Sequence, residues 1–165
     1  GKSKRAKGII RGFINEHSYR IRQKAAPATP RKTRITHQGR HFNLMDSYKT
    51  LNDGYFEGRV DCRITWGRRV MRARFRSVRL GSYSSAARVI RINPMLDREF
   101  VPLYVLESII YHEMLHCILG FKHIGGRRLS HYAEFRSLEK RYLQWREAKA
   151  WIKKNLDLLT GKIVV

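Results

Sequence analysis

The sequence predicts an α+β domain in which a small three-stranded antiparallel sheet packs on an apolar helix and on a long C-terminal helix, with a basic arm at the N-terminus. Three observations predict this organisation. A chain of 165 residues, 42% of them hydrophobic, can bury one sizeable core. Apolar residues recur at helical spacing in three segments, and three short segments alternate as strands do. Positive charge is concentrated before residue 42, so we expect an arm over residues 1–41 and one folded domain over residues 42–165.

The arm is defined by its charge, since residues 1–41 contain twelve Lys or Arg and a single acid, Glu16. Two prolines in the run AAPATP interrupt any continuous helix. Residues 8–24 are compatible with a short helix, and the rest is expected to be extended or to become ordered on binding. The alternative is a solvated tail without a specific target.

The first half of the domain is expected to hold one helix and then three strands. Leu44, Tyr48, Leu51 and Tyr55 recur at steps of four, three and four, which predicts an amphipathic helix ending in the run NDGYFEG. The runs VDCRITW, MRARFRSVRL and ARVIRINP then predict strands over residues 60–66, 71–80 and 87–94.

The second half is expected to hold two helices. Pro102 suits the first turn of a helix that is apolar throughout and stops near Gly120. A polar loop, KHIGGRRLS, follows. The last helix is expected to begin with Ser130 as its N-cap and to extend to Leu156, because its aromatic and aliphatic residues keep to one stripe.

The excess of positive charge points to an anionic partner: 35 Lys and Arg against 13 Asp and Glu give a formal net charge of +22. We favour nucleic acid, because neutralised phosphates release counterions and so add affinity. An acidic protein or an acidic membrane surface are the competing partners, but no apolar run is long enough for a membrane span. Cys62 and Cys117 form no CxxC pair, which favours reduced thiols. We expect a monomer that is intracellular, either cytoplasmic or associated with the nucleoid or nucleus.

The run YHEMLHC, residues 111–117, carries the strongest chemical signal. On a helix His112 and His116 project from one face and can bind the same metal ion. Glu113 lies about 100° round the helix from His112, where it can accept the proton of a metal-activated water. Two ordinary helix histidines are the alternative, but uncoordinated imidazoles in so apolar a helix would be costly. The motif predicts a zinc site with Glu113 as general base.

Three kinds of residue are candidates for a third protein ligand. His123 falls one position later than the metzincin pattern HExxHxxGxxH requires. Glu134 and Glu139 are placed like the downstream helical glutamate of gluzincins, and His131 follows a glycine-bearing loop long enough to turn the chain back. We favour His131. Cys117 is expected to be a buried thiol rather than a ligand, because consecutive helix positions point about 100° apart.

Four runs in this order, LNDGYFEGRVDCRITWGRR, RLGSYSSAARVIRINPML, YHEMLHC and SHYAEF, resemble the SprT-like, or Spartan-type, metalloprotease domain over residues 42–145. The resemblance implies a compact zincin-like fold, zinc bound by His112, His116 and His131, and Glu113 as general base. It also implies cleavage of proteins, in the Spartan branch of proteins crosslinked to DNA. Tyr132 departs from the family pattern, which usually has Gly after the third histidine, and the sequence lacks the zinc ribbon of some members.

A cationic stripe on the predicted strand 71–80 is the candidate nucleic-acid surface, because alternate arginines share one face. With its neighbours it comprises Arg68, Arg69, Arg72, Arg74, Arg76 and Arg79. Tyr83, in the run GSYSS read as a loop, is the aromatic on which an unpaired base could stack. Trp66 and Phe75 are expected in the core. A solvated sheet face is the alternative reading of the arginines.

These features together predict a zinc-dependent endopeptidase that acts on protein substrates in association with nucleic acid. DNA is favoured over RNA as the nucleic acid, and DNA–protein crosslinks are the candidate substrates. An extended substrate is expected to pair with a free sheet edge, for which the strand Arg88–Asn93 is the candidate. One alternative is a nucleic-acid-binding protein with a structural zinc site. The other is a zinc-dependent nuclease.

Overall fold

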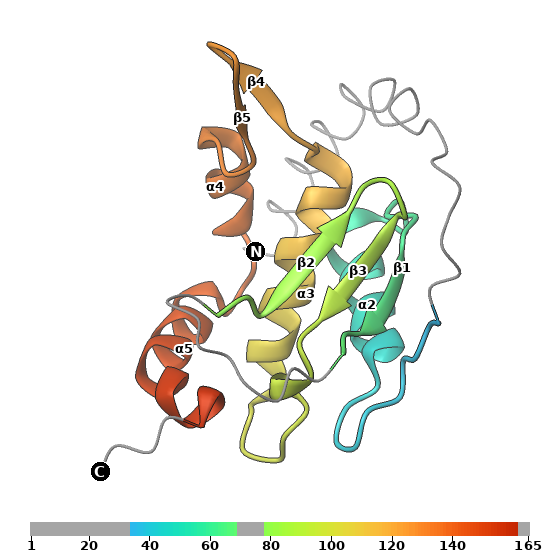
Figure 1. The fold of residues 1–165 in the computed structure, drawn as a ribbon, viewed down its shortest axis with the longest axis vertical. Helices are drawn as coiled ribbons and strands as arrows, with labels where there is room; N and C mark the ends of the chain where they lie inside the picture. Colours follow the sequence, from blue (N-terminus) through green and yellow to red (C-terminus); the bar gives the residue numbers. More distant parts are fainter. Residues whose placement is uncertain (1–33, 69–77, 162–165) are drawn as a thin grey trace.

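The computed structural model describes residues 34–68 and 78–161 and has the α+β architecture that the sequence predicts (Figure 1). Its elements in chain order are α2 (Leu44–Phe56), β1 (Arg63–Trp66), β2 (Gly81–Ser84), β3 (Val89–Ile92), the 3-10 turn η1 (Pro94–Leu96), α3 (Leu103–Leu119), β4 (Lys122–Ile124), β5 (Arg127–Leu129), α4 (Ala133–Glu139) and α5 (Trp145–Thr160). The expected short helix of the arm and most of the expected strand 71–80 lie outside the described residues. Among the helices that are described, none is long and apolar enough to cross a membrane.

The three-stranded sheet is mixed, so the prediction of an antiparallel sheet was wrong. Its strand order is β1-β3-β2, with β1 parallel and β2 antiparallel to β3. β2 and β3 form a hairpin that inserts β3 beside β1, and the alternation of residues within a strand does not specify such an order. β3 is therefore the central strand, and the prediction that Arg88–Asn93 forms a free edge was also wrong. The edge that lies over α3 is β2 (Figure 1).

α2 forms where the apolar spacing predicts it and fastens the chain that enters the sheet. The side chain of Asn43 caps its first turn, and Glu57 ends it in the left-handed conformation. The amide of Asn52 bonds both backbone groups of Val60 at 3.0 Å, and the hydroxyl of Tyr48 donates to the Val60 carbonyl at 2.8 Å. These buried bonds fix the path of the chain just before β1.

Residues 36–41, which the sequence assigns to the arm, contact the folded unit. The backbone N–H of Trp66, at the end of β1, donates to the carbonyl of Thr36 at 2.9 Å. The carboxylate of Asp97 accepts the backbone N–H groups of His41 and Phe42 at 2.9 and 3.2 Å. The part of the arm that is described thus runs along the sheet and the η1 turn.

α3 is the central helix of the core and provides a rigid base for the site. Val105, Leu106, Ile110 and Met114 are fully buried on it. It ends at Gly120, as predicted, where a φ of +61° favours glycine. Because α2, α4, α5 and the sheet all pack on α3, side chains that project from it have little freedom to move (Figure 1).

The C-terminal region forms two helices, so the prediction of one long helix was wrong. α4 begins after Tyr132 rather than at Ser130, and a turn separates it from α5. Tyr142 in this turn is buried and donates from its hydroxyl to the carbonyl of Tyr104 on α3 at 3.1 Å. Apolar residues of both helices face the same core, and for this reason their spacing in the sequence resembles one continuous stripe.

Candidate metal centre and cleft

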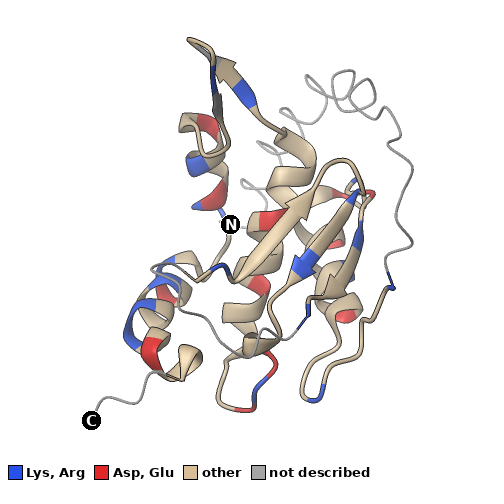
Figure 2. Ribbon diagram, in the orientation of Figure 1, with Lys and Arg blue, Asp and Glu red and all other residues tan. Residues whose placement is uncertain are grey.

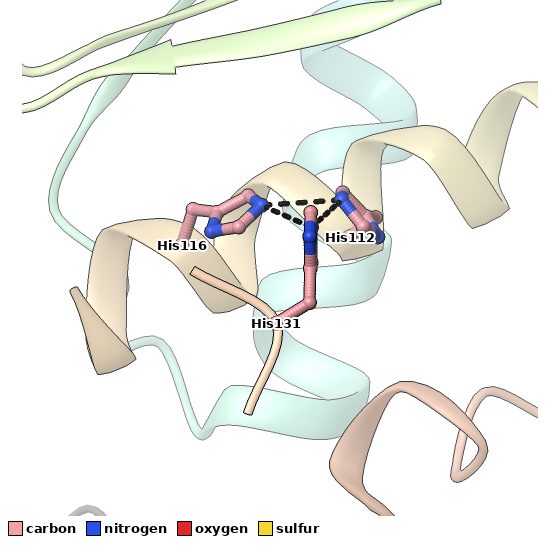
Figure 3. Close-up of side chains that lie close together, drawn as sticks. All are labelled: His112, His116 and His131. Atoms are coloured by element: carbon pink, nitrogen blue, oxygen red, sulfur yellow. Dashed lines mark hydrogen bonds between the residues drawn. The ribbon is translucent and has the colours of Figure 1, made fainter. Parts of the chain in front are cut away.

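Three histidines converge in the structure, and they are the three that the sequence favours as ligands. His112 and His116 project from α3, and His131 reaches them from the segment between β5 and α4 (Figure 3). Their Nε2 atoms lie 3.1 Å apart in each of the three pairs. The three side chains are close enough together to hold a metal ion.

His131 is brought to α3 by a β-hairpin where the sequence predicts a polar loop. β4 and β5 pair antiparallel, with Ile124 opposite Arg127 across a two-residue turn. Gly125 and Gly126 form that turn with φ values of +56° and +74°, the conformation that a tight hairpin of this kind requires. The hairpin reverses the chain and returns it to the helix that carries the first two histidines.

None of the other candidate ligands belongs to the group of described residues that could hold a metal ion. His123 is exposed on β4. Glu134 lies 2.6 Å from the ammonium group of Lys122. The thiol of Cys117 is hydrogen-bonded by the other cysteine, which lowers the pKa of Cys117. Glu139 contacts Nδ1 of His112, the ring nitrogen that faces away from the other two histidines, and does not reach the common centre itself.

α4 carries two further side chains that position the histidines, and they follow His131 at steps of four. The ring of Phe135 is fully buried, with its centroid 4.5 to 5.1 Å from each of the three imidazoles. The carboxylate of Glu139 lies 2.8 Å from Nδ1 of His112. Since Nε2 of His112 faces the other histidines, Nδ1 carries the proton and donates it to Glu139. The sequence analysis missed this role, although the spacing of four was visible.

The chemistry of the histidine group fits a cation. His116 is 8% exposed, and burial together with the neighbouring His112 and His131 lowers its pKa to about 3, so that it is neutral near pH 7. Three imidazole rings cannot satisfy one another fully when all three Nε2 atoms point at a common centre. A metal ion at that centre would accept all three lone pairs.

Glu113 lies buried between α3 and β2, next to the histidine group. It is 5% exposed, and burial raises its pKa to about 7, although His112, Arg79 and the backbone N–H of Tyr83 oppose that rise. A Cβ atom added to Gly81 would lie 2.8 Å from Oε1 of Glu113. The absence of a side chain at Gly81 therefore allows the backbone of β2 to approach the carboxyl group.

A cleft of about 510 Å³ opens above the histidines. Its floor is the exposed side of α3. One wall is the edge of β2 that pairs with none of the described strands, and the opposite wall is the face of α5 that carries Trp145, Lys149 and Ile152. The cleft has room for an extended peptide beside β2, with a backbone carbonyl close to the three Nε2 atoms.

Only some of the residues predicted to contact nucleic acid lie in the described ranges. Arg68 and Arg79 are exposed, and Arg79 lines the cleft. Tyr83 is half-buried in β2 and packs against the core, so its prediction as an exposed loop residue was wrong. Trp66 packs against the core, as expected. The other predicted residues, Arg69, Arg72, Arg74, Phe75 and Arg76, lie outside the described ranges.

Comparison of the chain with family models, with curated proteins and with solved structures gave no match. The likeness to SprT-like domains therefore depends on the sequence motifs quoted above. Function has to be inferred from the histidine group, from Glu113 and from the cleft.

Proposed function

We propose that this chain is a zinc-dependent endopeptidase of the SprT-like type that cleaves proteins in association with DNA. One observation carries the proposal: three Nε2 atoms converge next to the buried carboxyl group of Glu113, on the floor of an open cleft beneath a free strand edge. This combination serves peptide hydrolysis, which needs an electrophilic centre, a base and a place for an extended chain.

The donor set is the reason for choosing zinc. Zinc in proteins takes histidine nitrogens at about 2.0–2.1 Å in a tetrahedron, which separates two ligand nitrogens by about 3.3 Å. The Nε2 atoms of His112, His116 and His131 are 3.1 Å apart. When bound, zinc would polarise the substrate carbonyl and make a water molecule more acidic. His131 is exposed on the cleft side, and such access favours a catalytic site over a closed structural one.

Glu113 is suited to move a proton in this setting. A base works best when its pKa is near the working pH, and burial raises the pKa of Glu113 to about 7. The backbone N–H of Tyr83 holds the carboxylate in place by a hydrogen bond. In the proposed reaction Glu113 accepts a proton from the attacking water and later delivers it to the leaving amine.

The free edge of β2 is the proposed binding site for the substrate backbone. Among the described strands β2 pairs with β3 alone, so its other edge faces the cleft. A substrate that pairs with this edge is recognised mainly through its main chain, which makes cleavage tolerant of sequence. Such tolerance fits an enzyme for varied proteins, and the resemblance to Spartan-type proteases suggests proteins crosslinked to DNA.

The net charge of +22 supports the association with nucleic acid. Arg79 lines the cleft itself, and Arg68 is exposed at the end of the described segment that follows β1. A protein held on DNA by such charges meets crosslinked proteins at high local concentration, which would confine cleavage to substrates on DNA.

The test is incubation of zinc-loaded protein with a model protein, alone and with single-stranded or double-stranded DNA. We expect protein fragments from the wild type when DNA is present, and none from the Glu113→Gln variant with the same zinc content. An intact model protein under all conditions would contradict the proposal. Cleavage of the DNA instead would support the nuclease alternative.

A further inference from the structure

A second hollow, of about 330 Å³, opens beside the metal centre where α4 meets α5. It shares five residues with the cleft, His112, His131, Glu139, Trp145 and Lys149, and adds two cations, Arg136 and Lys140. We name four of these residues the cationic hollow: Arg136, Lys140, Trp145 and Lys149. Figure 2 shows Lys and Arg along α5, and both basic and acidic residues on α4. No residue of this set belongs to the nucleic-acid surface predicted from the sequence.

Positive charge exceeds negative charge in the hollow, where Arg136, Lys140 and Lys149 face one carboxylate, that of Glu139. Arg136, Lys140 and Lys149 are exposed, and within the described part of the chain none of them forms an ion pair. The one carboxylate in the lining, Glu139, bonds to Nδ1 of His112 at 2.8 Å. The hollow thus offers several unpaired cations to an anionic ligand.

Two of these cations lie over one aromatic ring, and both are at the ends of flexible side chains. The ammonium groups of Lys140 and Lys149 are 5.8 and 5.4 Å from the centroid of the Trp145 ring. Trp145 is only partly buried, and its ring lines both the hollow and the cleft. An aromatic ring flanked by lysines can stack a base while the lysines contact the phosphates on either side.

We propose that the cationic hollow binds the phosphodiester backbone of a single-stranded nucleic acid, with an unpaired base on Trp145. A single strand is required because the bases of a duplex are stacked on each other and cannot reach a ring in a recess. The site deepens the proposed function and rests on it in one respect: a strand bound here runs directly beside the cleft, so that a protein attached to the strand lies next to β2.

The binding test uses the full chain carrying Glu113→Gln and loaded with zinc, with fluorescently labelled oligonucleotides of one length: single-stranded DNA, single-stranded RNA and double-stranded DNA. The test variant is Lys140→Ala with Lys149→Ala. The matched control is Lys49→Ala with Lys154→Ala, which removes the same charge from exposed positions outside the hollow. Lys154 lies about 140° round α5 from Lys149.

We expect the test variant to bind single strands about tenfold more weakly. The slope of the logarithm of the binding constant against the logarithm of the salt concentration should become shallower by about 1.4, or about 0.7 for each lost phosphate contact. The control should change the affinity by less than about threefold, through general charge alone.

The comparison of single-stranded DNA with single-stranded RNA identifies the sugar that is preferred. An equal loss in both double variants would overturn the proposal, because the binding would then depend on net charge. If neither single strand binds, while a labelled acidic peptide binds the wild type and not the test variant, the hollow is a site for acidic substrate side chains, and the proposal is also overturned. Because this assay needs no peptide cleavage, its result is independent of whether the protein is a protease.

Discussion

The buried position of Glu113 should make the metal-free protein less stable at neutral pH than a variant without this carboxyl group. In the folded protein its pKa is raised from 4.5 to about 7, chiefly by burial. Above about pH 4.5 the unfolded chain ionises Glu113, while the folded chain does so only near pH 7. The unfolded state therefore binds fewer protons in this window, and stability is lost as the pH rises through it.

The size of the effect follows from the difference in pKa. A shift from 4.5 to about 7 corresponds to about 3 kcal/mol, at about 1.4 kcal/mol for each unit. Glu113→Gln keeps the shape of the side chain and an oxygen for the N–H of Tyr83, but it cannot ionise. We expect the variant to gain stability over the wild type progressively from about pH 4.5 to pH 7, approaching about 3 kcal/mol at pH 8.

The assay is denaturant unfolding of both proteins after removal of metal, followed by tryptophan fluorescence at several pH values. Comparing the variant with the wild type at each pH cancels the contributions of groups that titrate independently of Glu113, including those at other sites. A stability difference that is the same at pH 5 and pH 8 would refute the reasoning. So would a variant that is less stable than the wild type at pH 8.

Three further changes test the way the site is positioned. Glu139→Gln removes the charge that orients His112 and should weaken zinc binding about 10- to 100-fold, measured by competition with a chelator; an unchanged affinity would count against the role of Glu139. His131→Ala leaves two histidine ligands and should lower the zinc retained after dialysis to well below one ion per chain, so full retention would exclude His131 as a ligand. Gly81→Ala places a Cβ 2.8 Å from Oε1 of Glu113. It should lower the free energy of unfolding by about 1–3 kcal/mol and reduce proteolysis, and a fully active, equally stable variant would show that the contact is absent.

The helices that precede and carry the histidine motif could be predicted because their signals are local. The apolar spacing of α2 and the stop at Gly120 each involve residues within a few turns of one another. Two of the candidate metal ligands could be predicted for a related reason, since His112 and His116 are one turn apart. His131 needed a longer argument, because a hairpin and not a loop brings it back to α3.

The order of the strands and the split of the C-terminal region into α4 and α5 could not be predicted from local sequence signals. Whether β3 lies at the edge or in the middle depends on pairing between segments that are far apart in sequence. In the turn between α4 and α5, the buried Tyr142 bonds to the carbonyl of Tyr104, a long-range contact that no spacing along the chain specifies. Both features nevertheless shape the cleft, since β2 and α5 are its two walls.

The run GSYSS shows why a local rule can fail beside the candidate site. Small polar residues favour turns, so the run reads as a loop that exposes Tyr83. In the structure the same residues form β2, and Gly81 leaves room for Glu113 against the strand while the backbone of Tyr83 bonds the carboxylate. A larger side chain at position 81, typical of a strand, would displace the carboxyl group from the metal centre. The weak strand signal is thus a consequence of the close approach that the proposed chemistry needs, and it marks the segment as part of the site.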